Sequence, residues 1–249
     1  MRRLIVGNWK LYVNSLEEGK KLLKNIDAKF PRGVKNEVVI CAPVFLAGAL
    51  RREYKGKRIS IGTQDTFWES EGAYTGAISP VHIKSSGIDY VLIGHSERRA
   101  QGDTDEIVSK KAVAAIGAKL HPIICVGELE RDTDGKFFSM IAKSVKGSLA
   151  RIEPTQAGKI TVAYEPVWAI GTMEAASARV AVEAILYIRK TIADMWGREY
   201  ALKVRIIYGA AVDAENAKLF ASEKNIQGLL PGRASVDAEE FTSIIKNFA

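Results

Sequence analysis

Cysteine is scarce in this chain. Only two cysteines, Cys41 and Cys125, occur among its 249 residues, and each falls within an apolar run typical of a strand. Neither belongs to a C-x-x-C pair, which leaves no sign of a disulfide framework. We therefore expect both to be buried, reduced thiols of a cytosolic protein.

Long apolar runs and targeting signals are also missing. No window reaches about 18 uninterrupted apolar residues, and the apolar run that follows Met1-Arg2-Arg3 is too short for a signal peptide. No Pro/Gly/Ser-rich linker and no shift in composition divides the chain. The sequence thus predicts one domain, residues 1–249, in the cytoplasm and without a membrane partner.

Blocks of like charge are absent as well. The formal net charge is +7, but the basic residues occur in scattered pairs, such as Arg2-Arg3 and Arg98-Arg99, interleaved with acids. There is no stripe of alternating basic and aromatic residues of the kind that binds single strands. We therefore expect no nucleic-acid partner, and a small anionic substrate fits the charge instead.

The chain does contain an eightfold alternation of short apolar runs and amphipathic stretches. The runs predicted as strands are Leu4–Gly7, Val38–Cys41, Ile59–Thr63, Tyr90–Ile93, Pro122–Val126, Ile160–Tyr164, Val204–Tyr208 and Gly228–Leu230. The stretches predicted as helices are Leu16–Phe30, Leu46–Arg52, Pro80–Ser86, Thr104–Ile116, Lys136–Ile152, Ser177–Trp196, Ala214–Phe220 and Ala238–Phe248. Capping-box spacing marks three of the helix starts: Ser15–Glu18, Asp103–Glu106 and Asp237–Glu240.

The strands have no polar alternation, which is typical of parallel strands buried on both faces. Eight units in 249 residues give about 31 residues each, close to one strand and one helix per unit. This spacing favours an α/β fold of the closed (β/α)₈ barrel type over an open doubly wound sheet. In such a barrel the functional side chains belong to the loops that follow each strand.

The most informative loop follows the sixth predicted strand, where residues 163–172 read AYEPVWAIGT. Pro166 cannot donate to a strand ladder, so the strand ends at Glu165 and presents a carboxylate at its carboxyl end. The apolar segment behind it, Val167-Trp168-Ala169-Ile170-Gly171, lies where a loop is expected. We interpret it as a lid that closes on a ligand. The structural alternative is a core strand followed by a hydrophobic turn.

The loops after the first and fourth strands each carry one candidate side chain. Lys10 follows Gly7-Asn8 and would point into the mouth of the barrel as an anion contact, unless it is a solvated surface charge. His95 precedes a helix-like SERR start, and a helix N-terminus favours the neutral imidazole. A neutral ring can hydrogen-bond a carbonyl and transfer a proton; the alternative is a structural histidine, as we expect of the two others, His82 and His121.

Three further loops suggest binding surfaces. The loop after the third strand is long and has aromatic residues and glycines around a tip at Tyr74-Thr75, which indicates a docking loop or a loop folded over its own barrel. The turns after the seventh and eighth strands, residues 209–212 and 231–235, are short and rich in small residues. Such turns offer free main-chain N–H groups to a phosphate.

Together these segments resemble the triosephosphate isomerase family over nearly the whole chain. The resemblance rests on GNWK (7–10), CAP (41–43), TGAISP (75–80), IGHSERR (93–99), ICVGE (124–128), AYEPVWAIGT (163–172) and PGRAS (231–235). It implies a TIM barrel and an aldose–ketose isomerase that interconverts D-glyceraldehyde 3-phosphate and dihydroxyacetone phosphate in glycolysis and gluconeogenesis.

The resemblance also implies the catalytic roles. Glu165 is the base that takes a proton from the carbon next to the carbonyl, and His95, as neutral imidazole, polarises that carbonyl; this pairing is the family's known mechanism. Lys10 stabilises the developing negative charge and binds the substrate, with Asn8 beside it as a second substrate-binding residue and Glu97 orienting its ammonium group. The proton relay needs no metal and no organic cofactor.

Other positions carry over as binding residues. The lid corresponds to residues 166–172 (Pro166, Val167, Trp168, Ala169, Ile170, Gly171 and Thr172). Main-chain N–H groups of Gly171, Ala211, Gly232 and Arg233 would hold the phosphate. The Tyr74-Thr75 loop would dock on a partner in a homodimer.

This chain departs from the family pattern near the phosphate, at Ala210, Ala211, Met173, Pro231 and Arg233. Ala210 costs about 1 kcal/mol if the turn requires a positive φ. Ala211 lacks a hydroxyl for the closed lid, and Arg233 either adds a bidentate phosphate contact or obstructs the main chain. The alternatives are therefore a barrel that acts weakly or on another phosphorylated substrate, or a non-catalytic protein that binds a phosphate or a protein partner.

Overall fold

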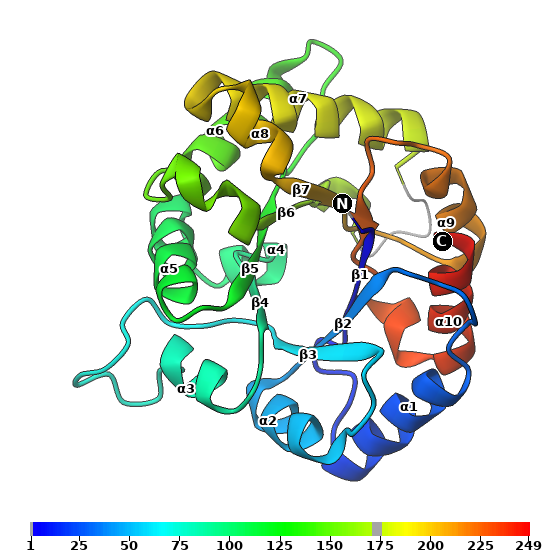
Figure 1. The fold of residues 1–249 in the computed structure, drawn as a ribbon. Coiled ribbons are helices and arrows are strands. Elements are labelled where there is room, and N and C mark those ends of the chain that lie inside the picture. The colour runs from blue at the N-terminus through cyan, green and yellow to red at the C-terminus, as the bar shows by residue number, and fades with distance from the viewer. Residues whose placement is uncertain (1, 171–175) are drawn as a thin grey trace.

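The computed structural model describes residues 2–170 and 176–249, and in them eight parallel strands form a closed barrel in the order β1 to β8 (Figure 1). The strands are β1 Leu4–Asn8, β2 Glu37–Ala42, β3 Ile59–Thr63, β4 Tyr90–Ile93, β5 His121–Val126, β6 Thr161–Tyr164, β7 Arg205–Tyr208 and β8 Gly228–Leu229. The predicted barrel is confirmed, and every predicted strand end lies within one residue of the observed end.

Pairing between the first and last strands closes the barrel. Leu4 pairs with Gly228 and Ile5 with Leu229, while β1 and β2 pair from Leu4–Glu37 to Asn8–Cys41. Alternate strand residues fill the interior of the barrel, and the others pack against the helices. The strands are therefore buried on both faces, which explains why they lack polar alternation. Cys41 and Cys125 lie in the barrel interior as free, buried thiols, as predicted.

Helices surround the strands. They are α1 Leu16–Ala28, α2 Val44–Glu53, α3 Pro80–Ser85, α4 Ser96–Ala100, α5 Asp105–Gly117, α6 Lys136–Leu149, α7 Ala178–Trp196, α8 Arg198–Lys203, α9 Ala214–Ala221 and α10 Ala238–Asn247. Short 3₁₀ helices are η1 Pro154–Lys159, η2 Val167–Ala169 and η3 Arg233–Val236. The sequence predicted neither α8 nor the 3₁₀ helices, because each is too short to show a helical period, whereas α4 begins at the SERR start that was expected after His95.

One predicted helix start is wrong. The N-cap of α5 is Thr104, whose hydroxyl accepts a hydrogen bond from Ile107 N at 3.2 Å. Asp103 instead accepts a hydrogen bond from the buried Lys111 Nζ at 2.7 Å. Asp103 therefore forms a tertiary ion pair, although its spacing from Glu106 predicted a helix cap. Ser15 and Asp237 cap their helices as predicted.

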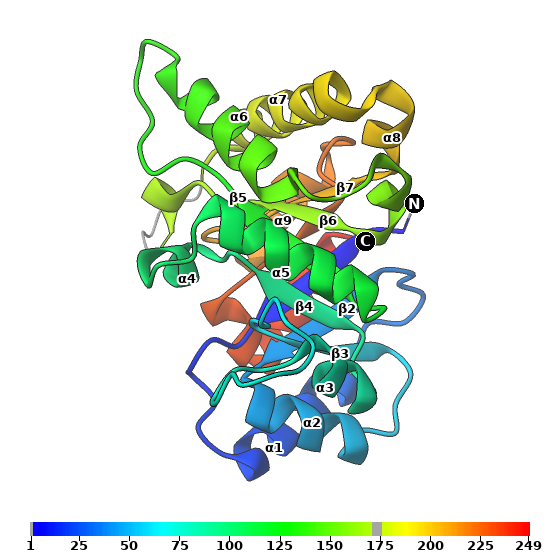
Figure 2. The same cartoon turned by 90° about the vertical axis from the view of Figure 1, so that its left-hand side faces the viewer.

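The arrangement defines a functional end of the barrel. Helix α4, which directly follows β4, lies at the end opposite both termini (Figure 2). The loop of residues 64–79 between β3 and α3 projects from the barrel (Figure 1). Among residues 2–170 and 176–249, we find no helix with the length and apolarity needed to cross a bilayer.

Candidate active site

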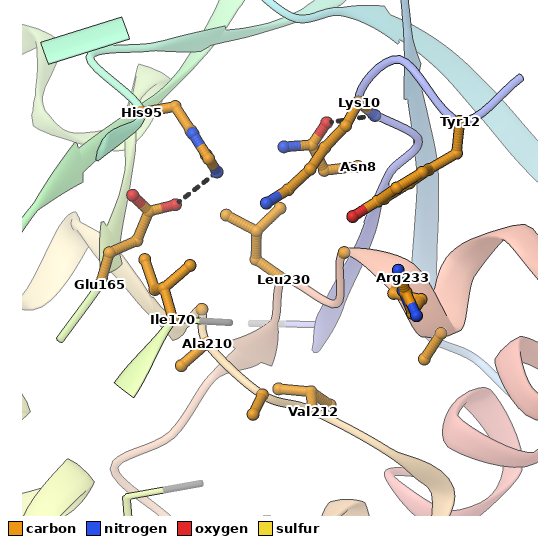
Figure 3. Close-up of a pocket in the computed structure, with 14 residues that line it drawn as sticks. Asn8, Lys10, Tyr12, His95, Glu165, Ile170, Ala210, Val212, Leu230 and Arg233 are labelled. Carbon is orange, nitrogen blue, oxygen red and sulfur yellow. Dashed lines mark hydrogen bonds and ion pairs between the residues drawn. The ribbon is translucent and has the colours of Figure 1, made fainter. Parts of the chain in front are cut away.

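Glu165 lies at the carboxyl end of β6, where Pro166 stops the strand. Its side chain is almost completely buried, at 3% relative exposure. Oε2 accepts a hydrogen bond from the main-chain N–H of Ser96 at 3.1 Å, and Oε1 lies 3.4 Å from Nε2 of His95. The predicted base and the predicted histidine therefore converge, although they come from β6 and from the loop after β4 (Figure 3).

The ring of His95 is fixed by the helix that it begins. His95 is the N-cap of α4, and its Nδ1 accepts a hydrogen bond from Glu97 N at 3.2 Å. A ring nitrogen that accepts an N–H carries no proton of its own, so the network assigns the proton of the neutral ring to Nε2. That N–H is directed toward Glu165 and the cavity, where it can hydrogen-bond a ligand oxygen.

Lys10 is held in an unusual backbone conformation after β1. Its φ of 47° lies in the left-handed region, which is uncommon for a residue other than glycine. Three contacts hold it there: Lys10 N donates to Asn8 Oδ1 at 3.0 Å, Gln64 Nε2 donates to Lys10 O at 2.9 Å, and Lys10 Nζ donates to Glu97 Oε1 at 2.6 Å. The ammonium group reaches the same space as His95 and Glu165 (Figure 3).

These side chains border a cavity of about 540 Å³. It is lined by residues from the loops after β1, β4, β6, β7 and β8: Asn8, Lys10, Tyr12, His95, Glu165, Ile170, Gly209, Ala210, Ala211, Val212, Leu230, Gly232, Arg233 and Ala234. Each described residue that the sequence assigned to catalysis or to substrate binding is among them. Tyr12 and Leu230 were not predicted, whereas the small residues belong to the turns 209–212 and 231–235 that were expected to bind a phosphate.

Two turns, residues 209–212 and 231–235, border the cavity. The second carries Arg233 on the side away from Glu165 (Figure 3), whereas a Cβ on Gly209 in the first would lie 3.4 Å from Cγ of Glu165. Within the described part of the chain, the main-chain N–H groups of Ala211 and Gly232 have no hydrogen-bond acceptor. A Cβ on Gly232 would lie 3.3 Å from Cε of Lys10, so the missing side chain lets the lysine pass close to this turn. Free N–H groups next to a cation suit an anionic group of a ligand.

The structure shows the local effect of two of the departures from the family pattern, Ala210 and Pro231. Ala210 is not among the described residues with positive φ, so the turn needs no glycine there. Pro231 interrupts no pairing, because Leu230 N already donates to Tyr208 O at 2.7 Å and the Pro231 carbonyl accepts from Asn8 N at 2.9 Å. The predicted cost at Ala210 therefore does not arise.

The described part of the lid contacts the loop that follows β5. Residues 167–169 form η2, Trp168 Nε1 donates to Glu128 Oε1 at 2.9 Å, and Val167 N donates to Glu128 O at 3.0 Å. Beyond the lid, Ala176 N donates to Tyr208 Oη at 3.2 Å. Gly171, Thr172 and the neighbouring Met173 lie outside the described residues.

The role of Glu128 was not predicted from the sequence. Its carboxylate, 1% exposed, also accepts a hydrogen bond from Tyr164 Oη at 2.8 Å, and Arg131 lies 3.7 Å away. Burial raises the pKa of the Glu128 carboxyl above its usual value, while the hydrogen bonds from Trp168 and Tyr164 oppose the rise. The sequence feature that could have indicated this role is a charged residue just after a buried strand, at the end of the segment ICVGE.

An apolar surface borders the same end of the barrel. Large apolar side chains are exposed after β1, β2 and β3: Leu11 at 80%, Phe45 at 85% and Tyr74 at 47%. Thr75 at the tip of the loop is also exposed. The sequence singled out only the Tyr74-Thr75 tip, because a lone Leu or Phe carries no signal of exposure.

No group of three or more His, Cys, Asp or Glu side chains within residues 2–170 and 176–249 is arranged to hold a metal ion. Besides the Asn8 amide and the Tyr12 hydroxyl, the polar side chains that line the cavity are one carboxylate, one imidazole and two cations. Such a set can remove a proton from a carbon acid and stabilise the resulting oxyanion.

The chain is similar in sequence and in fold to known proteins of one family. The sequence profile of the family described as triosephosphate isomerase matches residues 3–248. The triosephosphate isomerase of Thermoanaerobacter pseudethanolicus is 42% identical over 248 residues, covering 98% of this chain and 99% of that protein. That of Moorella thermoacetica is 43% identical over 249 residues, covering 98% of each chain. The crystal structure of triosephosphate isomerase from Bartonella henselae superposes with a TM-score of 0.87 at 34% identity, covering 100% of this chain and 99% of that one.

Proposed function

The chain belongs to the triosephosphate isomerase family, and from this premise we propose that it interconverts D-glyceraldehyde 3-phosphate and dihydroxyacetone phosphate. The observation that carries the proposal is the 3.4 Å separation between Glu165 Oε1 and His95 Nε2 at the wall of the cavity. A carboxylate and a neutral N–H donor this close can act on adjacent atoms of one small carbonyl compound.

The proposed reaction is a proton relay through an enediolate. Glu165 takes a proton from the carbon next to the carbonyl, and the electron pair of that C–H bond moves to form the enediolate. His95 hydrogen-bonds the carbonyl oxygen through Nε2–H and moves protons between the two oxygens. The protonated Glu165 then returns its proton to the neighbouring carbon, so that no atom is gained or lost.

Lys10 would supply the positive charge in this relay. Its ammonium group lies at the cavity, and Glu97, whose Oε1 accepts from Nζ at 2.6 Å, fixes where that charge points. In a site screened from water a fixed cation stabilises an enediolate oxygen more than a mobile one. We assign Asn8 to holding the Lys10 backbone. Carboxylate, imidazole and ammonium suffice for the relay, so no metal or organic cofactor is required.

The phosphate and lid assignments complete the site. We assign the N–H groups of Ala211, Gly232 and Arg233 to the substrate phosphate, together with Gly171, and residues 166–172 to a lid that excludes water during the reaction. The hydrogen bond from Trp168 Nε1 to Glu128 supports a hinge at the first end of this lid. The side chain of Arg233 would add a charge-assisted contact to the phosphate.

We also propose a homodimer that buries the apolar surface of Leu11, Phe45 and Tyr74, with the Tyr74-Thr75 tip as the docking element. Sedimentation should give twice the chain mass of 27.3 kDa. A species of 27.3 kDa at all protein concentrations would contradict the dimer. A single domain over residues 1–249, a cytoplasmic location and a role in glycolysis and gluconeogenesis follow from the same proposal.

A coupled assay tests the proposed activity. The protein should convert D-glyceraldehyde 3-phosphate to dihydroxyacetone phosphate and back, and should act far more slowly on glyceraldehyde, which lacks the phosphate. No turnover above the rate without protein would overturn the proposal. Turnover confined to a different phosphorylated aldose would instead favour the second candidate, a sibling enzyme whose substrate is shifted by Arg233 at the phosphate end.

A further inference from the structure

Two side chains stand together at the end of the cavity opposite the proposed base. Arg233, at the start of η3, and Tyr12, in the loop after β1, both line the cavity. The guanidinium carbon of Arg233 lies 5.6 Å from the centre of the Tyr12 ring. Figure 3 shows both on the side away from His95 and Glu165.

Arg233 differs from the other cation of the cavity in what it contacts. Lys10 is paired with the Glu97 carboxylate at 2.6 Å. Arg233 is exposed, and within residues 2–170 and 176–249 its guanidinium has no ion pair and no hydrogen bond besides its contact with the ring. Its charge and its donors are therefore available to a ligand. A planar guanidinium presents a fork of N–H donors that matches two phosphate oxygens.

An unanchored arginine at a surface would move among many rotamers, which costs entropy when a ligand fixes it. The face of a tyrosine ring attracts a guanidinium and limits these positions. The loop that carries Tyr12 is itself held, because Tyr12 N donates to Trp9 O at 3.0 Å and Trp9 is fully buried. The main chain of Tyr12 is therefore held, and its ring lies beside the guanidinium at the mouth of the cavity.

We propose that Tyr12 is a positioning residue for Arg233, and that the pair makes the cavity selective for ligands carrying a phosphate at the end remote from Glu165. The inference rests on the proposed function for its substrate, but the phosphate contact itself is independent of turnover. The ring face, and not the phenolic hydroxyl, is the part of Tyr12 that the proposal requires.

A double-mutant cycle tests the pair, with calorimetric binding of inorganic phosphate and steady-state kinetics as readouts. Arg233→Gly should weaken phosphate binding about tenfold, as expected for the loss of a charge-assisted hydrogen bond. Tyr12→Leu should weaken it about two- to fivefold, and Tyr12→Phe, which keeps the ring face, should weaken it less. The same changes should raise KM more than they lower kcat.

The decisive result is the behaviour of Tyr12→Leu in the Arg233→Gly background. The proposal predicts no further weakening there, because the ring has lost the group that it positions. An equal weakening in both backgrounds would overturn it, as would a Tyr12→Phe variant as weak as Tyr12→Leu. If the protein bound phosphate but isomerised no triose phosphate, the proposed function would fail while the calorimetric cycle still tested the pair.

A matched control is available away from the cavity. Lys203 lies 4.9 Å from the centre of the Tyr200 ring in α8, and neither residue lines the cavity. Tyr200→Leu removes the same kind of contact and should leave phosphate binding unchanged. Sedimentation of each variant separates an effect on Arg233 from an effect on the dimer surface, since Tyr12 adjoins Leu11; a change in mass that accounts for the weakened binding would count against the proposal.

Discussion

Replacing Lys111 with methionine should destabilise the fold strongly, whereas the same change at its neighbour Lys110 should not. Lys111 is 3% exposed and donates to Asp65 Oδ1 and Oδ2 at 2.8 and 2.9 Å and to Asp103 Oδ2 at 2.7 Å. Methionine has a similar length but no charge. The variant therefore leaves the buried Asp103 carboxylate and the partly buried Asp65 carboxylate without the cation between them.

The size of the effect follows from this burial. Removing one member of a buried ion pair costs about 3–5 kcal/mol of unfolding free energy, because the remaining charge stays desolvated. Arg98 Nε lies 3.0 Å from Asp65 but makes no aligned hydrogen bond, so it compensates only in part. We expect a loss of about 3 kcal/mol. Lys110, half exposed and 2.9 Å from Glu106, forms a surface pair whose loss should leave stability nearly unchanged.

The pH dependence gives a second check. Burial raises the pKa of the Asp65 carboxyl, and the charge of Lys111 opposes the rise. Without Lys111 this pKa should rise further, so a folded variant can take up a proton that relieves the unpaired charge. A group whose pKa is higher in the folded state than in the unfolded state stabilises the fold at low pH. The difference in unfolding free energy between Lys111→Met and the parent should therefore shrink as the pH falls from 7 toward 5.

Urea unfolding at one protein concentration measures both effects. The expected result is a large loss for Lys111→Met at pH 7, a smaller loss at pH 5 and little change for Lys110→Met. A loss below about 1 kcal/mol at pH 7, or equal losses for the two variants, would refute the claim that the pairing of Lys111 with Asp65 and Asp103 stabilises the fold.

Three further predictions concern the surroundings of the site. Gly127→Ala should abolish folding or activity, because a Cβ would lie 1.9 Å from the main-chain oxygen of Glu165. Gly117→Ala, whose added Cβ would have no atom within 4 Å, should be tolerated in the same unfolding and activity assays. The stability of Glu128→Gln relative to the parent should increase as the pH rises through the raised pKa of Glu128. The reason is that the parent loses stability as this carboxyl ionises, whereas the amide does not ionise. Urea titrations at several pH values measure the trend. Both cysteines should resist a thiol reagent in the native protein and react after denaturation, because burial raises their thiol pKa values.

The barrel was predictable because its signal is repeated along the whole chain. Each strand is an apolar run such as Val38–Cys41, and eight of them at even spacing leave few other topologies. The convergence of Lys10, His95 and Glu165 then follows from closure, since every strand of a parallel barrel ends on the same rim. Local sequence identified the side chains, and topology brought them together.

The parts that escaped prediction depend on contacts between distant segments. Asp103 has the spacing of a helix cap, yet it pairs with Lys111, and Thr104 takes the cap. Glu128 belongs to the segment ICVGE (124–128), but only folding brings Trp168 into contact with it. The apolar surface at Phe45 is another case, because hydrophobicity alone does not tell an exposed side chain from a buried one.

The proposed acid–base pair is tested most directly by the turnover number of Glu165→Gln with D-glyceraldehyde 3-phosphate. The amide keeps the size of the side chain and can still lie beside His95, but it cannot accept the proton. The account predicts a fall in kcat of about a thousandfold, the range typical of a lost general base, in a variant that unfolds like the parent. A folded variant that retained kcat within about tenfold of the parent would contradict it, because another group would then be the base.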